Sequence, residues 1–248
     1  MKTILITGCS SGFGHATALY FLERGWKVIA TMRNPRADLF PASDNLRLLP
    51  LDVSDAGSIK NAIAEAGDID VLVNNAGIGL LASLEGTPIS TVRDVFETNT
   101  LGTIALSQAV LPQFRAKQSG TIINVTSTVT LKPLPLLAVY TASKAAVNAF
   151  TESLALELEP FNIKVRLVLP GLAPTTDFGK NATPRMENTQ LEPYQPLLDG
   201  VFNRMQQPQP TTKARDVAVA VWQAATNHNA PMRIPAGEDA VALANEVG

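Results

Sequence analysis

The sequence lacks the features that mark proteins held by disulfides, bound to nucleic acid or inserted in a membrane. It holds one cysteine, Cys9, among 248 residues, so no disulfide can form within the chain, which fits a reducing compartment. It contains 20 Lys and Arg residues and 22 Asp and Glu residues, so its net charge is −2 and it has no basic excess to bind nucleic acid. No stretch reaches the roughly 18 uncharged apolar residues of a membrane span, and the first apolar run ends at Thr7, too early for a signal peptide. We expect a cytoplasmic protein with no nucleic-acid partner and no membrane span.

Histidine is almost as scarce as cysteine. His15 and His228 are the two in the chain, and neither has an acidic or thiol cluster around it, so we predict no metal site. His15 follows Gly14 in an expected first helical turn, where both an ordinary helix-surface role and a place near an adenosine phosphate are open. Cys9 is most simply interpreted as a small packing residue.

The chain instead alternates short apolar runs with longer amphipathic stretches. Runs rich in Val, Ile and Leu on both faces predict strands that are covered by helices on both sides, and strand–helix alternation implies right-handed crossovers in a parallel sheet. With 46% hydrophobic residues and no linker or repeat, residues 1–248 are predicted to form a single α/β domain, a Rossmann-type doubly wound parallel sheet of about seven strands with helices on both faces. The predicted strands are 3–7, 27–32, 46–51, 70–74, 120–127, 164–170 and 231–235, and the predicted helices are 13–24, 55–65, 91–117, 140–159 and 214–226.

Residues 174–212 interrupt this alternation. They are rich in Pro, Gln and Asn and have weak periodicity, which predicts a long irregular segment. The segment follows the sixth strand, at the carboxyl edge of the sheet, where open α/β sheets bind their ligands. We interpret 174–212 as a substrate-binding lid within the domain.

A glycine-rich turn joins the first strand to the first helix. Gly8, Gly12 and Gly14 allow a sharp turn and a close approach to a ligand, and a helix start offers free N–H groups and a positive dipole end that suit a phosphate. A tight turn without a ligand is the alternative. The spacing T-G-x-x-x-G-x-G also departs from the G-x-G-x-x-G of dinucleotide-binding folds.

That spacing resembles the glycine motif of the short-chain dehydrogenase/reductase (SDR) family, and further motifs of the family follow in order up to about residue 176. "LDV" (51–53) follows the third strand, "NNAG" (74–77) the fourth, and "ETNTLG" carries Asn99. The resemblance implies four catalytic residues, which are Asn99, Ser127, Tyr140 and Lys144. Tyr140 and Lys144 are the first and last residues of the family's Y-x-x-x-K motif. The resemblance also implies a cofactor site that comprises Gly8, Ser10, Ser11, Gly12, Phe13, Gly14, Asp52, Val53, Asn75, Ala76, Gly77, Tyr140, Lys144, Pro170, Gly171, Ala173 and Thr175.

The pair of Tyr140 and Lys144 suits proton transfer to a carbonyl. Hydride transfer to a carbonyl leaves negative charge on oxygen, which requires a proton donor. At i and i+4 the two side chains share one helix face, where the ammonium should lower the phenol pKa from about 10. The Ser127 hydroxyl can hydrogen-bond the substrate oxygen. The resemblance implies that Asn99 holds a water molecule behind Lys144, which links the site to solvent by a proton relay. Taken one at a time, each has a simpler interpretation: Tyr140 and Lys144 as a surface contact, Ser127 as a turn or cap residue, and Asn99 as a side chain that bonds backbone. Found together in this order, they predict catalysis.

The residue after Met32 decides the expected cofactor. NAD-using relatives carry an Asp where this chain has Met32, and Arg33 follows it. A carboxylate would repel a 2′-phosphate, whereas a guanidinium can bind it bidentately. Arg33 is therefore added to the cofactor site and the prediction is NADP(H) rather than NAD(H), with a solvated loop residue as the alternative.

Apolar segments should surround the reacting carbon. The segments 78–83 and 131–137 are apolar, and the lid adds Phe178, Tyr194, Leu197, Leu198, Phe202 and Met205, which either dock the lid or line a hydrophobic pocket. We expect a bulky apolar ketone or secondary alcohol. "LITGCSSGFG", "NAGIGLL" and "ELEPFNIKV" are similar to the 17β-hydroxysteroid and retinol dehydrogenase subgroup, which implies a steroid- or retinoid-like substrate, although Thr130 stands where relatives often have Gly.

Two other functions remain open, a 3-oxoacyl reductase and a non-enzymatic NADP(H) sensor on the same fold. The resemblance also implies a homodimer or homotetramer that pairs through the helices 91–117 and 140–159. A small apolar face with Ala145, Ala149 and Leu154 would suit such packing.

Overall fold

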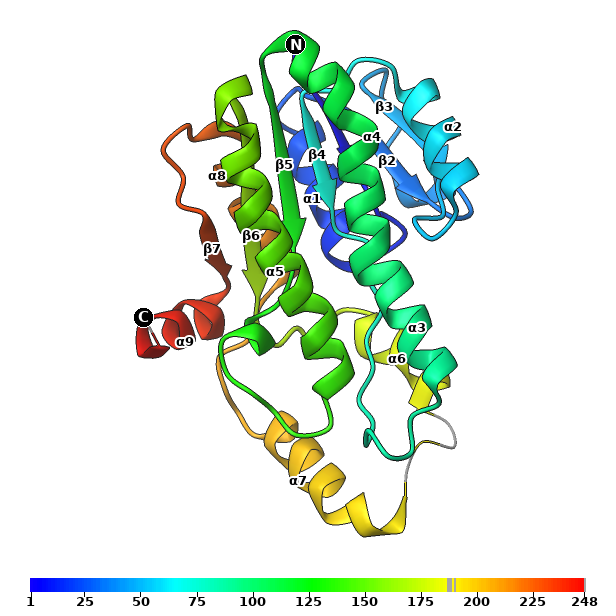
Figure 1. The fold of residues 1–248 in the computed structure, drawn as a ribbon, viewed down its shortest axis with the longest axis vertical. Helices are drawn as coiled ribbons and strands as arrows, with labels where there is room; N and C mark the ends of the chain where they lie inside the picture. Colours follow the sequence, from blue (N-terminus) through cyan, green and yellow to red (C-terminus); the bar gives the residue numbers. More distant parts are fainter. Residues whose placement is uncertain (187–188, 190, 248) are drawn as a thin grey trace.

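The computed structural model describes residues 1–186, 189 and 191–247 (Figure 1). One sheet of seven parallel strands runs through the molecule in the order β3-β2-β1-β4-β5-β6-β7. The strand order reverses between β1 and β4, and the carboxyl ends of the strands at such a point form the ligand crevice of open α/β sheets. The strands are β1 (Thr3–Ile6), β2 (Lys27–Met32), β3 (Leu46–Pro50), β4 (Val71–Asn74), β5 (Gly120–Val125), β6 (Ile163–Pro170) and β7 (Arg233–Ala236).

Helices cover both faces of this sheet, so the predicted doubly wound α/β fold is confirmed (Figure 1). Ile4 and Ile6 pack into one core with helices α1 and α8, whereas Leu5 packs into a second core with α2, α4 and α5. This split follows from the alternation of side chains along a strand. The helices are α1 (Gly12–Leu22), α2 (Ala56–Ala66), α3 (Ile89–Phe96), α4 (Gly102–Lys117), α5 (Ala138–Leu158), α6 (Phe178–Met186), α7 (Gln195–Gln206), α8 (Ala214–Thr226) and α9 (Glu238–Val247).

The irregular conformation predicted for 174–212 is wrong, because this segment contains α6 and α7. Pro196 lies in the first turn of α7, where a missing N–H costs no hydrogen bond. Its neighbour Pro193 lies likewise at the start of a 3₁₀ turn over Glu192–Tyr194. Prolines that begin helices therefore resemble loop residues in the sequence. Figure 1 shows α6 and α7 beyond the carboxyl ends of the strands.

Two further differences concern helices. The single helix predicted for 91–117 is instead α3 and α4 joined by a π-helical turn, Glu97–Leu101. The last helix, α9, follows β7 and was not predicted. Among the described residues, none of the helices is long and apolar enough to cross a bilayer.

Candidate active site

The glycine turn after β1 packs tightly against the segment that follows β4. Gly8 has φ +73°, and a Cβ atom on it would lie 2.9 Å from the Cα of Ala76. A Cβ atom on Gly14 would lie 2.3 Å from the Gly8 carbonyl oxygen. The Asn75 amide donates to the carbonyl of Thr7 at 2.8 Å, and the Thr7 hydroxyl accepts the backbone N–H groups of Asn75 and Ala76, both at 2.9 Å. Thr7, which sequence reasoning did not assign, therefore couples the two loops.

The first turn of α1 fits an anionic group. Gly12, which begins the helix, has φ +56°, and Ser11 at the N-cap makes no side-chain capping bond. The free N–H groups of this turn and the helix dipole favour negative charge. A Cβ atom on Gly12 would lie 3.6 Å from the side chain of Thr176, whereas the predicted Thr175 is exposed. Thr176, the neighbour of the motif residue, is thus the threonine that faces the turn.

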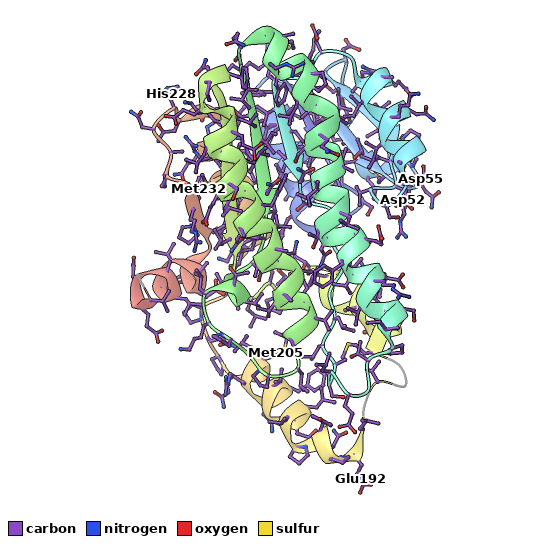
Figure 2. All side chains as sticks on the ribbon, viewed as in Figure 1. Asp52, Asp55, Glu192, Met205, His228 and Met232 are labelled. Atoms are coloured by element: carbon purple, nitrogen blue, oxygen red, sulfur yellow. The ribbon has the colours of Figure 1, made fainter. Side chains whose placement is uncertain are left out.

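Arg33 and Asp52 lie near each other at the carboxyl ends of β2 and β3. Hydrogen bonds from Ser54 hold the Asp52 pKa below its ordinary value, and the positive charge of Arg33 contributes in the same direction. Arg33 is exposed. Figure 2 shows Asp52 on the α2 side of the molecule, well away from the lid residues Glu192 and Met205. The structure therefore places a cation at the strand end where a nucleotide ribose would lie in such folds.

The His15 side chain makes contacts within the fold. Its Nε2 atom lies 2.8 Å from the carbonyl oxygen of Leu39, and its ring packs on Phe40 with centroids 4.9 Å apart. His15 thus links α1 to the connection between β2 and β3. Across the described ranges, no cluster of three or more His, Cys, Asp and Glu side chains could hold a metal ion. Cys9 is fully buried in the core, and burial raises the pKa of its thiol to about 12.

Asn99 lies in the π-helical turn, a type of helix defect found frequently at functional sites. Its Oδ1 atom accepts the N–H of Ile78 at 2.8 Å, and its Nδ2 atom donates to the Ile78 carbonyl at 2.9 Å and to the Ser143 hydroxyl at 3.0 Å. A Cβ atom on Gly77 would lie 3.2 Å from both Asn99 Oδ1 and Lys144 Nζ. The structure therefore brings Asn99 and Lys144 together at the loop after β4.

Tyr140 and Lys144 are both buried on the inward face of α5. The Lys144 ammonium donates to the carbonyl of Val125 at 3.1 Å, and burial lowers its pKa to about 8. Burial raises the pKa of Tyr140 to about 12, against a smaller opposite effect of its hydrogen bond with Ser127. The expected lowering of the phenol pKa is therefore wrong for this structure, because desolvation dominates the shift and Lys144 is not among its causes.

The loop after Ser127 is stabilised by the residue that departs from the family pattern. Ser127 caps the 3₁₀ turn Thr128–Thr130, and the Thr130 hydroxyl donates to the Ser127 carbonyl at 2.8 Å. The same hydroxyl accepts the side-chain amide of Asn148, on α5, at 2.9 Å. Thr130 therefore ties the Ser127 turn to the helix that carries Tyr140.

The three segments predicted to surround the substrate meet at an apolar pocket. The Ala82 N–H donates to the Leu136 carbonyl at 2.8 Å, and Leu136 has φ +64°, a strained conformation for a side chain of this kind. This pocket has a volume of only about 10 Å³, and none of the four predicted catalytic residues lines it. It is lined by Leu81, Ala82, Ser83, Leu136, Leu191, Tyr194, Gln195 and Leu198.

The lid residues separate into two groups. Leu198 and Tyr194 line the pocket, and the Tyr194 hydroxyl donates to Glu85 at 2.9 Å. Leu197, Phe202 and Met205 are 41–48% exposed and lie away from it. Prediction from composition could not separate them, because all are apolar and α7 was not foreseen.

The remaining predicted residues follow β6. Pro170 ends the strand, and Gly171 and Ala173 are half-buried in the turn that leads to the lid. On the other side of the crevice, Val53 is buried after β3, Phe13 packs against the α1 core, and Ser10 is exposed in the glycine turn. Asn99, Tyr140 and Lys144 lie on helices, whereas the other predicted site residues lie at the carboxyl ends of the strands, in the turns that leave them or in the first turn of α1.

Comparisons of the sequence agree with this geometry. The chain matches the sequence model of the family described as short chain dehydrogenase over residues 2–187. It is 41% identical over 174 residues to a 3-ketodihydrosphingosine reductase of Bacteroides thetaiotaomicron, covering 68% of this chain and 63% of that protein. It is 38% identical over 191 residues to retinol dehydrogenase 8 of Bos taurus, covering 72% and 61%. The match spans less than two thirds of the length of these relatives.

Solved structures are similar over almost the whole chain. A short-chain dehydrogenase from Streptomyces avermitilis superposes with a TM-score of 0.86 at 33% identity, covering 99% of this chain and 91% of that one. A serine dehydrogenase complexed with NADP+ superposes with a TM-score of 0.82 at 28% identity, covering 96% and 95%. The C-terminal part beyond residue 187 therefore also has structural counterparts.

Proposed function

The chain belongs to the short-chain dehydrogenase/reductase family, and we propose that it is an oxidoreductase that interconverts a bulky apolar ketone and its secondary alcohol with NADP(H). One observation carries the proposal. Asn99, Ser127, Tyr140 and Lys144 are all buried at the carboxyl edge of the sheet, beside a glycine turn that fits a dinucleotide.

The proposed chemistry assigns each side chain a proton task. NADPH supplies the hydride when bound. The Tyr140 hydroxyl gives its proton to the substrate oxygen as negative charge develops there, and its high pKa keeps the phenol protonated at neutral pH. The Ser127 hydroxyl, hydrogen-bonded to Tyr140, orients the same oxygen. Lys144 remains charged below its pKa of about 8, and its ammonium would stabilise the tyrosinate that is left when Tyr140 gives up its proton.

The cofactor preference rests on Arg33. The exposed guanidinium of Arg33, at the end of β2, can bind a 2′-phosphate by donating two parallel hydrogen bonds to it. The serine dehydrogenase structure complexed with NADP+ supports the same choice. The glycine turn and the residues after β3, β4 and β6 would hold the rest of the dinucleotide.

The substrate class rests on the apolar lining of the pocket. Its lining residues come from the three segments expected to surround the reacting carbon, and most are aliphatic. Because the cavity holds only about 10 Å³, the proposal requires these segments to move apart when a bulky ketone binds. Two relatives are named as a 3-ketodihydrosphingosine reductase and a retinol dehydrogenase, and both names refer to lipid-like molecules. We therefore favour a long or bulky apolar ketone, which includes steroid- and retinoid-like compounds.

A ketone panel with NADPH tests this function. Wild type should reduce apolar ketones, and Tyr140→Phe should lose about 10²- to 10⁴-fold in kcat while still binding NADPH, because only the proton donor is removed. Wild type that binds NADPH and reduces no ketone would favour the sensor function. Preference for 3-oxoacyl thioesters over simple ketones would favour the 3-oxoacyl reductase.

We also propose a homodimer or homotetramer that pairs through α4 and α5. Ala145 and Ala149 are exposed on α5, as expected for a packing face, but Leu154 is buried in the core of its own chain. Leu156, which is 74% exposed, takes its place on the outer face. Light scattering of wild type and Leu156→Lys tests the interface, since a monomeric wild type would exclude it.

A further inference from the structure

The first turn of α9 contacts both ends of the lid. The Leu172 N–H, where the chain leaves β6, donates to Asp239 Oδ2 at 2.6 Å. The Thr212 hydroxyl, where the chain returns from the lid, lies 2.7 Å from Asp239 Oδ1 and 2.8 Å from the Ala236 carbonyl. Asp239 therefore connects two segments that are 40 residues apart in the sequence (212 − 172).

The two lid ends are also bonded directly to each other. The Gly171 N–H donates to the Thr212 hydroxyl at 2.9 Å, and the Thr212 N–H donates to the Leu172 carbonyl at 2.7 Å. Thr212 is 1% exposed, so water does not compete for these bonds. Together the contacts form one network with Asp239 as its acceptor.

The packing around Asp239 requires glycine at two positions. A Cβ atom on Gly171 would lie 2.0 Å from Asp239 Oδ2, and all of its three nearest atoms belong to that carboxylate. The backbone of Gly171 is not left-handed, so the carboxylate, not the turn, excludes a side chain there. Gly237 has φ +108°, and a Cβ atom on it would lie 2.2 Å from the Thr212 hydroxyl. The turn before α9 is thus shaped to bring Asp239 against the lid ends.

We propose that Asp239 is a positioning residue that holds the loop after β6 in its cofactor-binding conformation and keeps the two ends of the lid together. This inference rests on the proposed function, because Gly171 and Ala173 flank the clamped Leu172 and belong to the proposed cofactor site. The carboxylate accepts two hydrogen bonds, and its place in the first turn of α9 is favoured by the helix dipole. Asp239 touches neither substrate nor cofactor in this scheme and acts through Leu172 and Thr212.

Hydrogen exchange of the full chain without ligand tests the clamp itself. Asp239→Ala should accelerate exchange in segments 170–173 and 211–213, because the Leu172 N–H loses its acceptor. The groups that accept from Gly171 and Thr212, which are the Thr212 hydroxyl and the Leu172 carbonyl, then lose the contact that holds them in place. Glu238→Ala is the matched control, since Glu238 lies in the same turn of α9 but is exposed. Unchanged exchange in Asp239→Ala, or equal acceleration in both variants, would overturn the clamp.

Binding of NADPH, followed by calorimetry, tests the consequence for the site. Asp239→Ala should raise the Kd roughly tenfold, as expected for loss of a hydrogen bond to a charged group. Asp239→Asn should stay within about threefold of wild type, because its amide oxygen can accept from Leu172 while its NH₂ group donates to Thr212. Equal affinity in wild type and Asp239→Ala would overturn the positioning role.

A double-mutant cycle covers the case in which Asp239→Ala alone is too unstable to study. Gly171→Ala should lower the thermal midpoint when Asp239 is present, because the new Cβ atom meets the carboxylate. In the Asp239→Ala background the same substitution should lower the midpoint much less, since the clashing atoms are gone. Additive effects on the thermal midpoint would contradict this geometry. If wild type binds no nicotinamide dinucleotide, the proposed function fails, whereas the exchange data and the cycle still decide the clamp.

Discussion

The ring of Phe178 lies against the ring of Tyr140, with centroids 5.8 Å apart and planes tilted by 57°. Phe178 begins α6, so the first helix of the lid covers the proposed proton donor. The contact also requires Gly79, because a Cβ atom there would lie 2.8 Å from Phe178 Cε1. The lid thereby contributes to the burial that raises the pKa of Tyr140.

Phe178→Ala tests this contact. We expect the pKa of Tyr140 to fall from about 12 towards its ordinary value, because burial is the main cause of the shift. KM for a bulky apolar ketone should rise about tenfold, since a wall of the site is lost. Phenol absorbance in an alkaline titration and steady-state kinetics provide the two measurements.

Phe202→Ala is the matched control for that experiment. Phe202 is an exposed lid phenylalanine on α7, 41% exposed against 40% for Phe178, and lies outside the pocket lining. It should leave both measurements unchanged. Equal effects of the two substitutions would show that general loosening of the lid, not the Phe178–Tyr140 contact, is responsible.

Lys144→Met should abolish activity and stabilise the fold at neutral pH. The ammonium is buried, and its pKa falls from an ordinary 10.5 to about 8, so folding disfavours the charged form. Because the bond to the Val125 carbonyl is also lost, we expect a net gain of about 1–2 kcal/mol in the free energy of unfolding at pH 7.

The gain from Lys144→Met should depend on pH. Between the folded pKa of about 8 and the unfolded 10.5, the unfolded wild type binds more protons than the folded one. The penalty is therefore complete below about pH 8 and disappears as the pH rises towards 10.5. Urea unfolding at pH 7 and pH 10 should show the difference between the two proteins narrowing, and a constant difference would contradict the assigned burial cost.

The rate of ketone reduction should fall as the pH rises through about 8, where Lys144 loses its charge. Tyr140, with its pKa of about 12, remains protonated over this range and does not contribute to the decline. The measurement is kcat/KM for reduction at saturating NADPH, with thermal melting at each pH to exclude unfolding. A profile that stays flat to about pH 10 would remove Lys144 from the proton-transfer step.

Arg33→Asp should reverse the cofactor preference. Loss of a charge-assisted contact to the 2′-phosphate and the added repulsion should reduce kcat/KM for NADPH by about 10- to 100-fold. Use of NADH should be unchanged or improved, because a carboxylate can accept the ribose hydroxyl groups. Arg36→Asp is the control, since Arg36 already pairs with Asp38 at 2.5 Å. A wild type that prefers NADH would refute the assignment of Arg33.

Much of the fold could be predicted because strands buried on both faces have a strong local pattern. "TILIT" and "DVLVN" are apolar on both faces, and their order with the helices implies a parallel sheet. Helix α7 was missed because Pro193 and Pro196 occupy the starts of the 3₁₀ turn and of α7, where they are tolerated. Helix α6 was missed because it contains Pro184, a residue that normally interrupts a helix. The π-helical turn at Asn99 was missed because it changes only the register of hydrogen bonds, which leaves the amphipathic pattern almost intact.

The order of residues is enough to show which groups are available and at what spacing: the glycines of the first turn, Arg33 in place of an acid, and Tyr140 and Lys144 on one helix face. These are local properties, since a helix or a β–α turn relates residues that are close in the chain. Three other properties became visible in the folded chain: burial raises the Tyr140 pKa and lowers that of Lys144, Phe178 covers Tyr140, and Asp239 joins the ends of the lid. Such properties depend on desolvation and on contacts between residues far apart in the chain, which arise only when the elements pack together.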